Sequence, residues 1–154
     1  MKKAITLSIF SVFLVACASN DKVEVATDEP IQYMDLTSDD KKELIKEYWV
    51  VEKRQEPKYP IDAARKGLSG CVDLIVGINS DGRLGGYKVK KSYPEGVFDE
   101  HAAAALTHWK WVATEINSDK TPVLTSIQLD FMVSGSKNKT ESENQCGYSH
   151  NLYL

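Results

Sequence analysis

Apolar and polar residues alternate with a period of two in three separate stretches of the chain. The first runs from Gly70 to Ile78, the second from Leu84 to Lys91 and the third from Val123 to Val133. A period of two is typical of a β-strand with one buried face. The residues from Asn79 to Gly82 join the first two stretches and favour a tight turn, so the pattern predicts a β-hairpin there.

A helical spacing of apolar residues separates the second and third stretches. Phe98, Ala102, Ala105 and Trp109 follow one another at offsets of four, three and four, which is the spacing of one buried helix face. We therefore predict a helix over residues 97–110 that packs against the sheet.

Two further helices are expected before the first strand. Within Leu36-Thr37-Ser38-Asp39-Asp40, a hydroxyl or carboxylate cap followed by first-turn acids begins a predicted helix that ends near Val50. Residues 59–67 place Pro60 at the start and Gly67 just past the end, as in many short helices. The fold class is therefore α+β: a small antiparallel three-stranded sheet with one face covered by helix, preceded by short helices.

The N-terminal segment has the features of an export signal. Lys2 and Lys3 precede an apolar run over residues 4–16, which is too short for a membrane span of roughly 20 residues. The run ends in Leu14-Val15-Ala16-Cys17, which resembles the bacterial lipoprotein processing box. This resemblance implies that the signal peptide, residues 1–16, is removed and that the Cys17 thiol carries acyl chains, palmitate among them.

The residue after Cys17 bears on where such a lipoprotein would reside. Ala18 stands there, whereas enterobacterial-type sorting uses an Asp at this position to retain a lipoprotein at the inner membrane. The resemblance therefore implies a lipid anchor in the outer membrane, on the periplasmic face. A simple secretory signal, cleaved after Ala16 or Ala18, is the alternative.

Composition places one domain after the signal. Removing residues 1–16 leaves 138 residues, with 17 basic and 22 acidic side chains and a net charge of −5. This mildly acidic balance disfavours a nucleic-acid partner, which requires a basic face. Residues 17–36 are polar and predict a flexible tether; residues 37–133 form the expected domain, and residues 134–154 a polar tail.

Two cysteines remain beyond Cys17. In an oxidising compartment Cys71 and Cys146 are expected to form a disulfide, which would fasten the tail to the first strand. The alternative is a metal site built on Cys146 and His150, but two thiols and one imidazole at this spacing match no familiar zinc pattern.

The sequence offers little for catalysis. His101 and His108 lie seven residues apart on one predicted helix, about 10 Å along its axis and too far to share a metal ion. Asp73 and Asp130 are paired carboxylates only if their strands are neighbours, and solvated sheet residues are the simpler interpretation. Phosphate-loop, zinc and nucleophile-elbow patterns do not occur, so we expect no enzyme activity, metal or cofactor.

The predicted elements and several short motifs together resemble the C-terminal domain of TonB proteins. The resemblance covers roughly residues 55–133, and no motif in it is specific alone. It is carried, in order and spacing, by Tyr59-Pro60, Ala63, Gly67, Gly70, Asp81-Gly82-Arg83, Ser92, Phe98-Asp99, Ala104, Trp109-Lys110-Trp111 and Ile127-Gln128-Leu129.

The TonB resemblance implies a periplasmic, non-catalytic module that binds a short extended peptide of an outer-membrane transporter. In that family the peptide pairs with the exposed edge of the last strand, which is recognition by strand addition. Apart from the resemblance, Trp109 and Trp111 could form a platform for a sugar or a base, but Trp109 falls on the buried face of the predicted helix and is expected in the core; Trp111 is left open. The residues expected at the peptide site are Thr125, Ile127, Leu129 and Phe131 on the strand and Glu56 and Tyr59 beside it.

The chain departs from full-length TonB proteins, which have an N-terminal transmembrane helix and a long Pro-rich region. A tether of about 20 residues reaches at most about 70 Å, so we expect a domain that stays near the outer membrane, accessory to TonB-dependent transport. The alternative function is a structural or assembly subunit of a secretion or motility apparatus that uses its sheet edge for self-association, for example as a homodimer.

Overall fold

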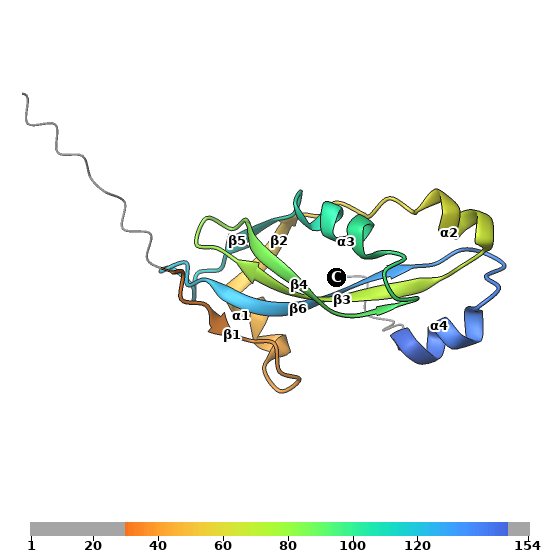
Figure 1. Cartoon of the computed structure of the whole chain (residues 1–154). Helices are drawn as coiled ribbons and strands as arrows, with labels where there is room; N and C mark the ends of the chain where they lie inside the picture. The colour runs from red at the N-terminus through yellow and green to blue at the C-terminus, as the bar shows by residue number, and fades with distance from the viewer. Residues whose placement is uncertain (1–29, 148–154) are drawn as a thin grey trace, which may run out of the picture. The chain divides into compact units, whose positions relative to one another are not determined.

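The computed structural model describes residues 30–147 (Figure 1). The predicted signal peptide, the predicted lipidation site at Cys17 and residues 148–154 of the tail lie outside the described residues. No helix within residues 30–147 is long and apolar enough to cross a membrane.

The main sheet has four strands in the order β1-β6-β3-β4. Strands β3 (Gly70–Ile78), β4 (Leu84–Tyr93) and β6 (Val123–Phe131) are antiparallel neighbours, as the period-two stretches predicted. The prediction of a three-stranded sheet was incomplete, because the short strand β1 (Met34–Asp35) pairs in parallel with the start of β6.

A second sheet consists of two strands, β2 (Trp49–Lys53) and β5 (Lys110–Ala113), which pair antiparallel. We call it the β2–β5 ribbon. Its β5 strand contacts the β3–β4 hairpin where the Trp111 N–H donates to the Gly82 carbonyl at 2.9 Å. A Cβ on Gly82 would lie 2.0 Å from the Trp111 carbonyl oxygen, so this turn requires glycine.

Each strand of the ribbon begins within the last residues of a predicted helix. The helix expected to end near Val50 is confined to a 3-10 turn, η1 (Lys42–Leu44), and one turn of α-helix, α1 (Ile45–Tyr48). The helix expected over residues 97–110 is α3 (Asp99–Leu106). Strand begins at Trp49 because that residue and its β-branched neighbours find a pairing partner in β5, a tertiary contact that outweighs helical spacing.

The core lies between the main sheet and α3. The inward side chains of β3 and β6 pack against α3 and against the aromatic residues of neighbouring segments; this buried cluster includes Val72, Leu74, Val76, Ile78, Phe98, Ala102, Leu106, Trp109, Trp111, Leu129 and Phe131. Trp109 is in the core as predicted, and Trp111, which was left open, is buried beside it. The short helix α2 (Ile61–Lys66) ends at Gly67 in the left-handed conformation, as its sequence predicted.

The opposite face of the sheet carries the C-terminal helix α4 (Lys139–Cys146), and Figure 1 shows α3 and α4 on the two sides of the sheet. The expected disulfide between Cys71 and Cys146 is present, with Cα atoms 5.7 Å apart. A helix in the polar tail was not predicted, because its sequence has no apolar stripe.

The tether was expected over residues 17–36, but its last residues belong to the folded domain. Met34 and Asp35 pair with β6, and Leu36 is buried in the core. The tether prediction was therefore wrong at this end. Its polar composition concealed two apolar side chains, Met34 and Leu36, that alternate around Asp35 in a strand.

Candidate functional site

The outer edge of β6, on the side away from β3, is the candidate site. In an antiparallel ladder each residue turns its N–H and C=O to one side, and successive residues alternate. Leu36 donates its N–H to the Leu124 carbonyl at 2.9 Å, so Leu124 faces outward. By alternation Ser126, Gln128 and Asp130 also face outward, and residues 30–147 supply no main-chain partner to these three.

An apolar groove of about 480 Å³ runs along this edge on the core side. Its walls come from α1, from the β2–β5 ribbon and from β6. They are formed by Ile45, Lys46, Trp49, Val50, Val51, Trp109, Trp111, Thr125, Ser126 and Ile127.

Hydrogen bonds hold the tryptophans of this apolar groove in place. The Trp49 indole N–H donates to the Thr121 carbonyl at 3.0 Å, and the Trp109 indole N–H donates to the Gln55 carbonyl at 2.9 Å. The Arg54 guanidinium lies 5.1 Å from the Trp109 ring centroid, within the range of a cation–π contact. The apolar wall is therefore fixed before any ligand arrives.

A polar groove of about 530 Å³ lies on the other side of the same edge. It carries charges of both signs, and Ser126 lines it as well as the apolar groove. Its lining residues are Thr37, Asp39, Lys42, Glu43, Asp73, Lys90, Ser126, Gln128 and Gly147.

Two polar residues of β6 mark the far end of the edge. Gln128 donates from its amide nitrogen to Asp130 Oδ1 at 2.8 Å and to the Cys146 carbonyl at 3.1 Å. Burial raises the pKa of Asp130 above its ordinary value, and the Gln128 hydrogen bond opposes that shift. The helix α4 is thereby tied to the end of the edge.

The structure separates the six residues expected at the peptide site. Thr125 and Ile127 line the apolar groove. Phe131 stacks on Phe98 with ring centroids 4.4 Å apart, and Tyr59 meets both rings edge-on; Leu129 is also buried.

Glu56, the sixth residue, does not line the apolar groove. It pairs with Arg54 at 2.7 Å and lines a cavity beside α3 that also contains His101 and His108. Within residues 30–147 no group of three metal-binding side chains comes together.

Sequence reasoning missed the residues whose main chain faces outward, Ser126, Gln128 and Asp130, and the wall residues Trp49 and Val51. The alternation of β6 could have divided its residues into two sets. It could not show which set faces β3, because that depends on the neighbouring strand.

The opposite edge of the sheet, along β4, has a different character. Lys88, Lys90 and Lys91 lie on it, and its pairing with β3 shifts register twice. Lysines and register shifts on an edge strand oppose pairing with another chain. The β6 edge, by contrast, has no lysine over Val123–Phe131.

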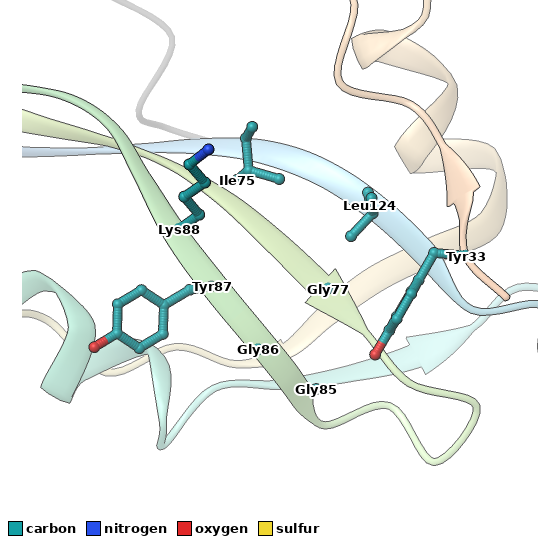
Figure 2. A pocket seen from close by; sticks show the side chains of 8 residues that line it. All are labelled: Tyr33, Ile75, Gly77, Gly85, Gly86, Tyr87, Lys88 and Leu124. Carbon is teal, nitrogen blue, oxygen red and sulfur yellow. The ribbon is translucent and has the colours of Figure 1, made fainter. Parts of the chain in front are cut away.

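A small hollow of about 200 Å³ near β4 explains how the segment before β1 is held (Figure 2). The Tyr33 hydroxyl donates to Asn79 Oδ1 at 2.6 Å. The Tyr33 side chain lies over two glycines: a Cβ on Gly77 would lie 3.1 Å from its ring, and a Cβ on Gly85 would lie 2.3 Å from its hydroxyl oxygen. This packing fixes β1 at the start of the β6 edge.

Comparison with known proteins gives consistent matches. The family model described as Gram-negative bacterial TonB protein C-terminal matches residues 55–133. Protein TonB of Xanthomonas campestris pv. campestris is 32% identical over 78 residues, which are 51% of this chain and 35% of that protein. Protein TonB of Pseudomonas aeruginosa is 34% identical over 55 residues, 36% of this chain and 16% of that protein.

Solved structures are also similar. The solution NMR structure of the Pseudomonas aeruginosa TonB CTD aligns with a TM-score of 0.49 and 21% identity, covering 66% of this chain and 94% of that one. The chain spans about a third or less of the length of the curated relatives it matches. The α1–β2 segment, which forms one wall of the apolar groove, precedes the matched residues.

Proposed function

The chain belongs to the family of Gram-negative bacterial TonB C-terminal domains, and from that premise we propose that it is a non-catalytic envelope protein that binds an extended peptide by strand addition. The partner proposed is a segment of an outer-membrane transporter, and the role is accessory to TonB-dependent transport.

The unpaired edge of β6 carries this proposal. Ser126, Gln128 and Asp130 turn their main-chain donors and acceptors away from β3, to a side where residues 30–147 supply no main-chain partner, and such groups supply the affinity in strand addition. The strand β1 already pairs with the first two residues of the same edge. The edge therefore accepts a neighbouring strand, and β1 leaves the rest of it open.

The contrast between the two sheet edges supports one site rather than two. The lysines of β4 would repel a second strand of like charge and would lose hydration on pairing. The β6 edge has no such residue and adjoins an apolar groove, so we place the partner there.

We also propose that Cys17 carries the lipid anchor, because Leu14-Val15-Ala16-Cys17 resembles the lipoprotein processing box. An acyl anchor at this position would hold the domain at the periplasmic face of the outer membrane, near the transporter. A Cys17→Ser chain is expected to leave the membrane fraction and to lose incorporation of a labelled palmitate analogue. Membrane retention with label still present would contradict the anchor but not the peptide site.

Site-specific photo-crosslinking in cells tests the binding site. A photo-reactive amino acid in place of Gln128 on β6 is expected to form a covalent product with an outer-membrane transporter. The matched control carries the same group in place of Lys88 on the β4 edge and is expected to form none.

Each other crosslinking result has a definite meaning. Products at Lys88 but not at Gln128 would place the partner on the wrong edge for this proposal. Products containing only a second copy of the chain would favour the alternative function, a structural or assembly subunit that self-associates through its sheet edge.

A further inference from the structure

We propose that the β6 edge selects a peptide in which apolar and polar side chains alternate, with the apolar set facing the Trp49–Val51 wall. This inference rests on the proposed function, and it adds the chemistry of the bound segment. The Trp49–Val51 wall, which would contact the apolar side chains of the peptide, precedes residues 55–133. It is therefore a feature of this chain outside the family match.

Pairing with β6 fixes the face of the sheet on which each peptide side chain lies. Residues directly opposite each other on paired strands have side chains on the same face, whether the strands are parallel or antiparallel. A peptide residue opposite Ile127 would point into the apolar groove, as Ile127 does. Its neighbours, opposite Ser126 and Gln128, would point into the polar groove.

A segment of the chain, β1, already occupies the start of this edge. In β1, Met34 lies opposite Val123 and packs against the core, and Leu36 is buried there. Asp35, between them, is exposed and accepts a hydrogen bond from the Thr37 N–H at 2.9 Å. The strand seated on the edge therefore has the same alternation that we infer for the visiting peptide.

The two grooves differ in polarity. The apolar groove presents Trp49, Val51 and Ile127, and Lys46, which also lines it, is paired with Glu43 at 2.9 Å. A charged or amide side chain placed against Trp49 and Val51 would therefore lose water without a matching partner. The polar groove presents Lys42, Glu43 and other charged groups, which suit a hydroxyl or charged side chain. A strand at about 3.3 Å per residue spans residues 126–130 with about five of its own residues.

Two synthetic octapeptides of identical composition test the inference. In one, three valines alternate with three threonines between terminal lysines; in the isomer the three valines are consecutive. Binding is followed by NMR titration of the Cys17→Ser chain, and protection of the Ser126, Gln128 and Asp130 amides from solvent exchange reports pairing at the edge. The alternating peptide is expected to bind about tenfold more tightly than its isomer, which corresponds to about 1.4 kcal/mol.

Matched substitutions on the ribbon assign the effect to the wall. Val51→Asp places a charge on the groove side, and Val112→Asp places the same charge on the ribbon outside the groove; the two valines are 44% and 48% exposed. Val51→Asp is expected to abolish the preference for the alternating peptide, and Val112→Asp to preserve it. The milder Val51→Thr, expected to reduce the preference, serves if the aspartate variant unfolds.

The outcomes separate this inference from the proposed function. Equal binding of both peptides with the edge amides protected would overturn alternation and leave strand addition in place. If neither peptide protects those amides, strand addition at this edge fails, and the inference fails with it. A preference unchanged by Val51→Asp would overturn the role of the wall.

Discussion

Reduction of the Cys71–Cys146 disulfide is expected to lower the free energy of unfolding substantially and to free α4 from the sheet. The bridge joins residues 75 apart in sequence. In the chain-entropy model a closed loop of that length stabilises the native state by about 4 kcal/mol, since it restricts the unfolded chain. That is a large fraction of a typical domain stability of about 5–15 kcal/mol.

The local effect follows from the composition of α4. Only Ser142 and Cys146 are buried in this helix, and its cap residue, Asn138, makes no capping hydrogen bond. The start of the helix is held by paired hydrogen bonds between Asn138 and Ser69, of 2.8 and 2.9 Å. The end of the helix is held by the disulfide and by two hydrogen bonds, from Lys91 Nζ to the Gln145 carbonyl and from the Gln128 amide to the Cys146 carbonyl. Loss of order should therefore begin at Cys146.

Urea unfolding of the Cys17→Ser chain with and without a reductant measures the global effect. With an m-value of about 2 kcal/mol/M, typical of a small protein, the midpoint should fall by about 2 M. A variant carrying Cys71→Ala and Cys146→Ala is the control and should not respond to the reductant. Amide exchange measured under both conditions reports whether α4 opens while β3 stays protected.

Two results would refute this reasoning. An unchanged midpoint on confirmed reduction would show that the loop constraint adds nothing to stability. Full protection of the α4 amides in the reduced protein would show that polar contacts alone hold the helix, contrary to its lack of buried apolar surface.

Two further predictions concern Asp130 and Leu36. Burial raises the pKa of Asp130, so the folded state favours the protonated form and this carboxyl costs stability as the pH rises above its unfolded value of 3.8. Asp130→Asn should therefore raise the melting temperature at neutral pH and have little effect below pH 3.8; a lower melting temperature at neutral pH would contradict the burial argument. Leu36→Ala should cost about 2–5 kcal/mol in urea unfolding, as for other buried leucines, whereas Ile31→Ala, at an exposed position, should change it little; equal effects would show that Leu36 does not anchor β1.

Three of the four strands of the main sheet could be predicted because their signals are local. Alternation marks β3, β4 and β6 directly, and the residues from Asn79 to Gly82 supply a turn. Pro60 and Gly67 delimit α2 by their own backbone preferences.

The ribbon could not be predicted in the same way. Trp109 fits a helical face in sequence, yet it lies beyond the end of α3, and Lys110 begins a strand. Trp49 and its neighbours likewise follow a helical turn. Their conformation depends on a pairing between segments about 60 residues apart, which neither segment reveals alone.

The sequence by itself determined the family, the antiparallel core of the sheet and the two cysteines available for a bridge, because these depend on residue identity and short-range spacing. Only the tertiary structure decided which edge of β6 is unpaired. One set of its main-chain groups pairs with β3, and β1 pairs only with the start of the opposite edge. The tertiary structure also decided that an apolar wall and a polar groove flank that edge. A strand's own pattern gives the alternation of its faces and edges, but its neighbours decide which of them remain free.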